Sequence, residues 1–438
     1  MREGKLSNYF ECKRLGTNLQ TEIIAGLSTF LSLSYIFVVN PAILSDGGMN
    51  KSAVLFATVI ASALATLVMG IWAKKPFALA PGLEMNSYIV YYVILTLGFS
   101  WQCGLGIVFW SGVLFMILTL TNVREKIIHA IPEKLKTGLS ASVGVFLMLI
   151  ALKISGLIVY EGISIQSFSS PFTKPFYVFM VGLGLVFLLN RFKLKISILI
   201  SIIGATIFAH LIGLNISGRE RVLISGDMFS AFMQLDFSTI FEPKLLSTLI
   251  ILFVIDFYGS VAKFLAFTRG TTMIDSKGNM PKMKEALTVD GVATIAGAAL
   301  GTTSVTVYVE SAAGISVGGR SGLTAIVCAL LMLLFIPLAP IVNLVPVEAT
   351  TGALLMIGLK MFPKIYEIKY WNSIEIISVL CMVIVTFLTF SLDKAMAIGF
   401  IFYIFGFLFS GKRKEIDLYL IVSTLLISVA IILSIYGK

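Results

Sequence analysis

The sequence predicts an all-α polytopic membrane protein, with about fourteen transmembrane elements in two inverted seven-element repeats. The chain is 58% hydrophobic and 13% charged, with a mean hydropathy of +0.97, whereas soluble domains carry about 25% charged residues. Apolar stretches of about 20 residues, long enough to cross a bilayer, recur along the whole chain. The third stretch of each half is interrupted by a short extended run.

The first half is expected to hold seven elements, all helical except the third, because lipid cannot satisfy an open backbone. They are Thr21–Val39, Ser52–Trp72, the broken element Phe77–Leu97, Trp101–Leu120, Leu135–Leu152, Pro175–Asn190 and Ile196–Leu214.

The second half repeats this pattern with Leu245–Phe267, Ala286–Leu300, the broken element Thr303–Gly314, Leu323–Val345, Trp371–Leu392, Lys394–Ser410 and Leu418–Ile435. Residues 348–361 are expected to lie flat at the membrane interface, like the basic helix at residues 123–131. If residues 348–361 crossed the membrane instead, the basic run at residues 412–414 would face the cytoplasm.

The two broken elements occupy matching positions in the two halves. In each, an extended run (residues 77–80 and 304–307) is expected to turn into a half-helix. An odd number of elements per repeat turns the second half upside down relative to the first. Matching breaks in inverted halves are typical of a transporter binding site, although either break alone could be a kink without function.

Charge and cysteine usage narrow the class of protein. The net charge of +10 comes from Lys and Arg scattered through short loops, which orients the chain in a cell membrane with a cytoplasmic N-terminal segment, residues 1–20. These Lys and Arg residues do not form a basic face with interleaved aromatic residues, which is the pattern that would predict nucleic-acid binding. The four cysteines are far apart and show no metal spacing. With no phosphate loop and no nucleophile–base pair, we expect neither an enzyme nor a cofactor or metal site.

The first break carries polar residues inside an apolar segment. Pro81 and Gly82 end the extended run, and the N–H groups of the following half-helix point at the break. Asn86 offers both a donor and an acceptor to a ligand, and Glu84 is a carboxylate near the bilayer midplane. The alternatives are that Asn86 caps the backbone and that Glu84 pairs with a lysine.

Asp256 and Ser260 lie four residues apart and therefore share one helical face. Lys263 falls on nearly the same stripe, so a structural Asp256–Lys263 pair is the alternative to ligand binding.

Glu310, followed by Ser311, stands where the second half-helix begins. An ionised side chain at that depth costs about 2.5–3.5 kcal/mol on insertion scales, which favours a functional role. The alternative is a carboxylate satisfied by the N–H groups of its own half-helix. Carboxylates at a break suit a neutral ligand rich in N–H donors, and Asp256, Glu310 or Glu84 could carry a coupled proton.

Several stretches together resemble the AzgA-like purine permease branch of the nucleobase–cation symporters. The resemblance spans nearly the whole chain and rests on residues 29–45, 76–82, 293–302, Tyr308-Val309-Glu310-Ser311-Ala312-Ala313-Gly314 and Gly318-Gly319-Arg320-Ser321-Gly322-Leu323-Thr324-Ala325.

The resemblance implies a core domain from residues 21–122 and 245–346 and a gate domain from residues 123–214 and 347–438, with an extracellular loop at 215–244. It also implies proton-coupled uptake of hypoxanthine, guanine or adenine by an elevator-type movement, with a possible homodimer. The implied purine contacts are Asn86, Asp256 and Glu310.

The chain departs from the branch at three positions. Gly259 replaces a usual second aspartate, Lys263 stands where small residues are expected, and Glu84 stands where glycine is common. These departures bear on purine selectivity and on the coupling ion.

The main hypothesis is a proton-coupled purine importer in which Glu310, Asp256, Asn86, Glu84, Ser311 and Ser260 bind the base. The alternatives are a carrier of xanthine or uracil, an anion carrier of the same architecture, or a receptor or channel that does not transport. The acidic residues at the breaks argue against the anion carrier, whereas Lys263 favours it.

Overall fold

The computed structural model describes residues 5–121, 132–161, 164–168, 172–192, 197–214, 226–238, 242–268, 271–274, 280–337, 344–364, 368–390 and 392–411, with residues 194 and 417 and single positions between 420 and 432.

The first half begins with α1 (Lys5–Tyr9), α2 (Leu19–Leu33), α3 (Ile36–Asp46) and α4 (Lys51–Val68), which ends in a π-helical turn, η1 (Met69–Ala73). Strand β1 (Leu79–Pro81) leads into α5 (Leu83–Ser87), the π-helical η2 (Tyr88–Ile94) and α6 (Trp101–Leu120). Then come α8 (Glu133–Ile154), the strands β2 (Ile158–Glu161) and β3 (Ser164–Phe168), α9 (Lys174–Arg191) and α10 (Ser197–Leu211).

The second half begins with a 3₁₀ turn, η3 (Gly226–Phe229), and continues with α11 (Pro243–Thr268), α12 (Met283–Leu300), β4 (Val305–Val307) and α13 (Ser311–Ser316). It ends with α14 (Gly322–Met332), η4 (Leu333–Phe335), η5 (Val347–Thr350), α16 (Thr351–Lys360), α18 (Ser373–Thr389) and α19 (Leu392–Phe409).

Many of the helices are apolar and of membrane-spanning length. Within the described ranges, five helical stretches are long and apolar enough to cross a bilayer, namely Leu19–Asp46, Lys51–Ala73, Trp101–Leu120, Glu133–Ile154 and Lys174–Arg191. The shorter apolar helices are Ser197–Leu211 in the first half and Gly322–Phe335, Ser373–Thr389 and Lys394–Phe409 in the second. The expectation of a mostly helical, multi-pass membrane protein is therefore confirmed, while the count of fourteen elements stays a prediction.

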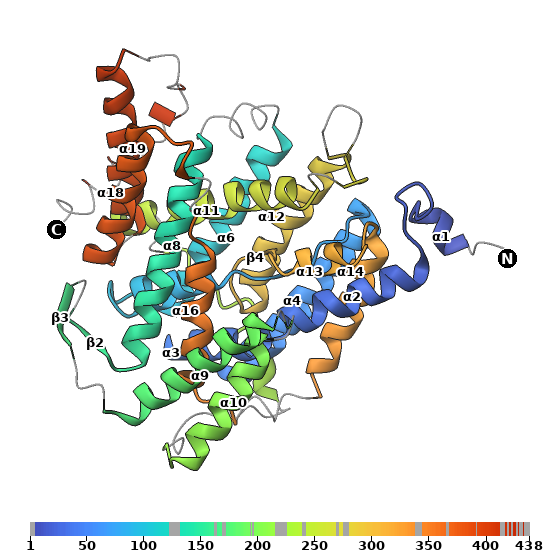
Figure 1. Ribbon diagram of the computed structural model, residues 1–438, viewed down its shortest axis with the longest axis horizontal. Helices are drawn as coiled ribbons and strands as arrows, with labels where there is room; N and C mark the ends of the chain where they lie inside the picture. The colour runs from blue at the N-terminus through green and yellow to red at the C-terminus, as the bar shows by residue number, and fades with distance from the viewer. Residues whose placement is uncertain are drawn as a thin grey trace.

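The two broken elements meet at the centre of the molecule, where β4 and α13 lie in Figure 1. β1 and β4 pair antiparallel, with Ala80 opposite Thr306. The ladder continues at both ends, because Gly82 N–H donates to Ser304 O at 3.0 Å and Tyr308 N–H donates to Ala78 O at 2.9 Å. Each break therefore satisfies the backbone groups of the other, as buried backbone inside a membrane requires.

The helices form two groups around this junction. In Figure 1, α2, α4, α12 and α14 lie on one side, and α8, α18 and α19 lie on the other, with α9 and α10 below them. Within the first group α14 packs on α2 and α12 packs on α6; within the second, α16 packs on both α8 and α9. A Cβ at Gly144 or at Gly358 would lie 2.5 Å from the other glycine's carbonyl oxygen, so α8 and α16 touch backbone to backbone.

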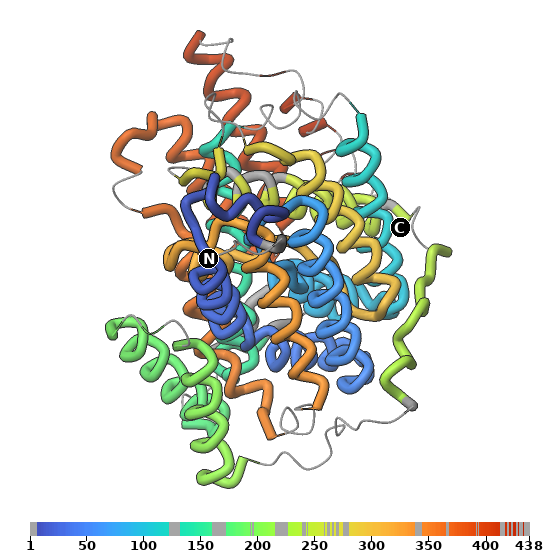
Figure 2. Tube along the Cα trace, turned by 90° about the vertical axis from the view of Figure 1, so that its right-hand side faces the viewer, coloured from blue at the N-terminus to red at the C-terminus, as the bar shows by residue number. Residues whose placement is uncertain are grey.

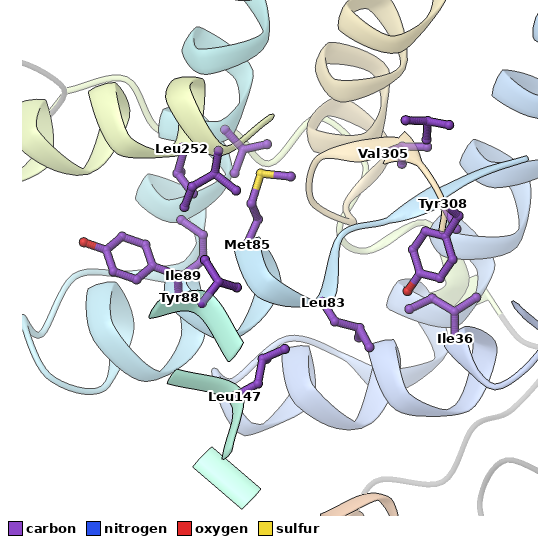
Figure 3. Packing of buried hydrophobic residues seen from close by; sticks show 14 of the residues in the cluster. Ile36, Leu83, Met85, Tyr88, Ile89, Leu147, Leu252, Val305 and Tyr308 are labelled. Atoms are coloured by element: carbon purple, nitrogen blue, oxygen red, sulfur yellow. The ribbon is translucent and has the colours of Figure 1, made fainter. Parts of the chain in front are cut away.

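Apolar side chains anchor the first half-helix between the two groups. Leu83, Met85 and Tyr88, from α5 and η2, are buried in one cluster with Leu147 of α8 and Leu252 of α11 (Figure 3). The polar residues of the same half-helix are thereby held at fixed positions next to the strand pair.

The segment before α11 lies along one edge of the bundle (Figure 2). The Phe229 ring lies 5.0 Å from that of Phe56 on α4, and the Phe237 ring lies 5.4 Å from that of Phe109 on α6. Met233 N–H donates to Ala299 O of α12 at 2.7 Å. Residues 226–238, expected as part of a loop, are therefore packed onto three helices.

The structure departs from the expected elements in three places. The single helix expected at Thr21–Val39 is divided into α2 and α3 at Ser34 and Tyr35, and α3 continues through Pro41 to Asp46. The hairpin of β2 and β3 was not expected, because its residues lie in a polar connection outside the apolar stretches. In the segment expected as Leu323–Val345, α14 ends at Met332 and η4 at Phe335. Residues 123–131 and most of Leu418–Ile435 lie outside the described residues.

Candidate functional site

Glu310 is the residue from which α13 begins, and a tyrosine holds its carboxylate. The Tyr35 hydroxyl donates to Glu310 Oε1 at 2.9 Å. Tyr35 lies at the division between α2 and α3, so this bond links the bend of the first element to the second half-helix. The ring of Tyr308 lies 6.4 Å from that of Tyr35 and covers the same region.

Asp256 of α11 is buried and binds two hydroxyl groups. Thr294 of α12 and Ser304, just before β4, donate to its Oδ2 at 2.7 and 2.9 Å. Its other oxygen, Oδ1, is buried and has no hydrogen-bond partner among the described residues. Asp256 therefore holds the start of β4 in place through Ser304, and its Oδ1 can still accept a hydrogen bond.

Asp290 of α12 is a second fully buried carboxylate, which the sequence analysis did not single out. Val307 N–H donates to its Oδ1 at 2.8 Å, and the Thr306 hydroxyl donates to its Oδ2 at 3.4 Å. Ser260 completes this side of the strand through a 2.8 Å hydroxyl contact with Thr306. The signal that could have revealed Asp290 was its charge within the apolar stretch Ala286–Leu300.

Asn86 and Ser311 are buried among backbone and amide groups. The Asn86 amide donates to Asn40 Oδ1, and Asn40 in turn donates to Thr58 at 2.7 Å and Thr302 at 3.0 Å. The Oδ1 of Asn86 is buried and accepts no hydrogen bond from the part of the chain that the structure describes. Ser311 Oγ accepts from Ala78 N–H at 3.0 Å and so joins α13 to the start of β1.

Glu84 and Lys263 face a cavity of about 310 Å³ beside the strand pair. Lys263 Nζ donates to Val307 O at 3.0 Å and lies 3.8 Å from Glu84 Oε1, with the two side chains 20% and 17% exposed. Lys263 therefore pairs with Glu84, and no ion pair with Asp256 occurs in the described part of the chain.

The cavity lies between the two groups of helices. One wall contains Glu84, Gly259, Lys263 and Val309; the other comes from α8, from the end of α16 and from Phe400 of α19. Most lining side chains are apolar, as is usual for small-molecule sites. Thus the three positions that depart from the branch pattern, Glu84, Gly259 and Lys263, all line the cavity.

The predicted site residues are all brought to the β1–β4 junction, but in different environments. Glu84 lines the cavity, and Glu310 follows Val309, which also lines it. Asp256, Asn86, Ser260 and Ser311 lie behind the wall in the hydrogen bonds described above. No group of three or more His, Cys, Asp and Glu among the described residues could hold a metal ion.

Two discontinuous helices that meet through paired strands, next to a cavity between two helix groups, define the class of polytopic membrane transporters. The solved structure of the transmembrane domain of a cyanobacterium bicarbonate transporter, BicA, is similar. It has a TM-score of 0.64 and 14% identity, and the match covers 87% of this chain and 97% of that one. At this identity the likeness shows the fold alone.

The chain belongs to the Permease family, whose sequence model matches residues 20–389. It is 36% identical over 411 residues to a putative permease of Methanocaldococcus jannaschii, covering 94% of each chain. It is 31% identical to the adenine permease AdeP of Escherichia coli, covering 98% of this chain and 96% of AdeP. It is also 31% identical to the guanine/hypoxanthine permease PbuG of Bacillus subtilis, covering 94% of this chain and 96% of PbuG.

These relatives confirm the resemblance found from the sequence motifs. The family consists of permeases, which are transporters and not enzymes.

Proposed function

We propose that the chain is a secondary active transporter that imports a purine nucleobase, namely hypoxanthine, guanine or adenine, together with a proton. The observation that carries this proposal is the cavity of about 310 Å³ at the junction of the two broken elements. Ligand sites of small molecules have volumes from about 300 Å³ upward, so the cavity is large enough for a bicyclic base. The relatives named adenine permease and guanine/hypoxanthine permease support the choice of substrate.

The base is held first by Glu84 and Lys263, which offer an acceptor and a donor side by side to the edge of the ring. The apolar wall around Val143 and Val309 covers the ring faces. Glu310 then exchanges the Tyr35 hydroxyl for an N–H of the base, which would couple binding to the bend between α2 and α3.

Asp256 and Asn86 do not line the cavity but lie next to residues that do, and they complete the proposed binding site. Each has a buried oxygen with no partner within the described ranges, and such an atom costs free energy until it accepts a hydrogen bond or a proton. We propose that Asp256, Glu310 or Glu84 takes up the coupled proton. Ser260 and Ser311 support the site by fixing β4 and α13.

Transport is proposed to proceed by an elevator-type movement of a core domain against a gate domain. The core contains α2–α6 and α11–α14, and the gate contains α8–α10 and α16–α19 (Figure 1). The mostly apolar lining of the cavity between the two helix groups supports this division into core and gate. Two domains that slide past one another must not leave many polar groups unpaired at their contact surface.

For α16 we favour the alternative in which residues 348–361 cross the membrane. The reciprocal contact of Gly144 with Gly358 supports pairing α8 and α16 as equivalent elements of the two repeats. Residues 412–414 would then lie on the same side as the N-terminal segment. A cell-membrane location with a cytoplasmic N-terminus, and a homodimer, complete the proposal.

The test is uptake of radiolabelled hypoxanthine, guanine, adenine, xanthine and uracil by cells that express the chain, with and without a proton uncoupler. We expect saturable uptake of at least one purine that the uncoupler abolishes. Absence of uptake of every base by well-expressed protein would contradict the proposal. Preferential uptake of xanthine or uracil would select the alternative substrates.

Glu310→Gln tests the site itself. We expect loss of uptake at unchanged expression, because the amide has one acceptor oxygen where the carboxylate has two, and because it cannot carry the proton. Glu375→Gln is the matched control, because Glu375 belongs to an exposed helix cap of α18 and should leave uptake unchanged. Unchanged transport in Glu310→Gln would remove Glu310 from the proposed site.

A further inference from the structure

A second pocket, of about 280 Å³, lies apart from the cavity between the helix groups. Three segments of the chain form its walls: residues 10–15 of the N-terminal segment, the turn at 73–75 after η1, and residues 272–274 and 281–282 between α11 and α12. Thr272 Oγ1 donates to Leu15 O at 2.7 Å and holds the first of these segments on the third.

The pocket is strongly cationic. Arg14, Lys74, Lys75 and Lys282 line it, whereas Glu11 is its only acidic lining residue within the described chain. Glu11 is engaged by Arg14 at 2.5 Å. Lys74 donates to Tyr9 O at 2.8 Å and Lys282 to Trp72 O at 3.1 Å, and such bonds to carbonyl oxygens do not neutralise the ammonium charges.

Lys75 is the buried member of this set. Its side chain is only 7% exposed, and no hydrogen bond or ion pair of its ammonium occurs in the part of the chain that the structure describes. Burial, and then the neighbouring charges of Arg14 and Lys282, lower the pKa of Lys75 to about 8, against the opposite effect of Glu11 and Glu285. The Lys75 ammonium therefore meets the pocket from a largely buried side chain and among like charges, a setting that an anion in the pocket would stabilise.

We propose that this pocket binds a phosphate-bearing anion, with the Lys75 ammonium as its buried contact and Arg14, Lys74 and Lys282 around it. Several cations from separate segments suit a multiply charged group with many acceptor oxygens, and an arginine fork matches phosphate geometry. The phosphate could belong to a free phosphorylated compound or to the headgroup of an anionic lipid.

A bound anion would tie the N-terminal segment to the turn that leads into β1. Lys75 precedes β1, which starts at Leu79, and β1 forms one strand of the pair beside the transport cavity. The ligand would therefore stabilise the core side of the cavity without entering it. This inference does not depend on which base is transported.

The experiment uses the full chain in nanodiscs of phosphatidylcholine, with thermal unfolding followed by intrinsic fluorescence. In one arm pyrophosphate is added; in the other, phosphatidylglycerol replaces part of the phosphatidylcholine. We expect stabilisation in at least one arm. Stabilisation by pyrophosphate identifies a free phosphate compound, and stabilisation by phosphatidylglycerol alone identifies a lipid headgroup.

Variants distinguish the pocket from general charge effects. Lys75→Gln should lower the affinity for the stabilising ligand by about tenfold or more, which is the loss expected for one charge-assisted hydrogen bond. Lys75→Arg should retain binding. Lys369→Gln is the control, because this lysine is exposed and lies outside the pocket. If Lys75→Gln does not fold, Arg14→Gln replaces it, since the Arg14 side chain is 67% exposed. No stabilisation in either arm, or equal losses in the pocket variants and Lys369→Gln, would overturn the proposal.

Discussion

Glu22 of α2 provides the sharpest test of how the core is held together. It is fully buried, and its carboxylate caps the start of α14. Oε1 accepts from Arg320 N–H at 2.9 Å and Ser321 N–H at 3.1 Å, and Oε2 accepts from Thr324 N–H at 3.1 Å and its hydroxyl at 2.6 Å. The first N–H groups of a helix have no partner within the helix, so a carboxylate there satisfies them and the helix dipole together.

Glu22→Gln keeps the shape of the side chain but leaves one oxygen instead of two. With the amide oxygen in place of Oε1, the N–H and the hydroxyl of Thr324 lose their acceptor. With it in place of Oε2, the Arg320 N–H loses its acceptor, whereas the Ser321 N–H keeps one because it also donates to Oε2 at 3.3 Å. Each such loss costs about 1–3 kcal/mol, so we expect a destabilisation of about 1–6 kcal/mol. Because α14 follows α13 in the chain, the displaced helix should also disturb the half-helix that begins after Glu310, and uptake should fall.

The assay is thermal unfolding of purified protein, compared with Glu375→Gln. Glu375 accepts an exposed hydrogen bond from Asn372 N–H at 2.8 Å, so the cost there should stay within about 1 kcal/mol. We therefore expect a melting temperature lower by several degrees for Glu22→Gln and nearly unchanged for Glu375→Gln. Equal, small shifts in both variants would refute the view that Glu22 is a structural cap of the core.

Three further predictions follow from the geometry. Gly314→Ala should destabilise the protein by about 1–3 kcal/mol and reduce uptake, because the new Cβ would overlap Thr29 Oγ1 and lie 2.6 Å from the Ala25 carbonyl oxygen. Gly184→Ala, whose Cβ would meet no described atom within 4 Å, should not destabilise the protein in the same melting assay. Gly259→Asp should fold normally, since nothing lies within 4 Å of its Cβ, and should change the order of substrate preference in competition uptake; an unchanged order would mean that this wall does not contact the base. The pKa of Lys75 is about 8 in the folded protein against an ordinary 10.5, so the folded protein binds fewer protons than the unfolded chain between these values. Without an anion the stability should therefore rise with pH over that window, by at most about 3.4 kcal/mol. A flat profile would contradict the assigned burial.

Sequence reasoning located the helices well because its main signal, apolar length, is imposed by the bilayer on each element separately. Trp101–Leu120 is found with the expected bounds, and the two extended runs become β1 and β4. What it could not supply were features set by distant contacts. The first element is divided at Tyr35, whose hydroxyl donates a hydrogen bond to the distant Glu310. The hairpin of β2 and β3 depends on pairing between residues outside the apolar stretches.

The candidate site was predicted in location but not in the contacts of its side chains. Spacing on one helix placed Lys263 on the same stripe as Asp256, yet the lysine reaches Glu84 on another element. Helical periodicity cannot reveal such a contact, because it depends on how the two broken elements cross. For the same reason Asp290 was missed: only the fold shows that it accepts the Val307 N–H of the strand pair.

A charged or polar residue in an apolar segment is therefore not by itself a sign of ligand contact. Breaking two helices frees backbone groups that must be satisfied inside the protein. Much of the polar chemistry near the breaks serves this need: Asp290 accepts from Val307, Ser311 accepts from Ala78, and Lys263 donates to the Val307 carbonyl. A ligand can recruit only the capacity that remains after these bonds are made.

The hydrogen-bonding capacity that remains for a ligand lies in a few atoms near the cavity. Glu84 faces the cavity itself, and one buried oxygen each of Asp256 and Asn86 has no partner in the described structure. Glu310 is engaged through one hydroxyl donor, which a base could displace without unpairing backbone. Substitutions should therefore differ in effect according to the groups that they leave unpaired. Changing Ser311 or Asp290 should first destabilise the fold, whereas changing Glu84 or Glu310 should first alter transport. Melting temperature and uptake measured on the same four alanine variants would separate the two groups, and a common loss of both properties in all four would show that scaffold and site cannot be distinguished here.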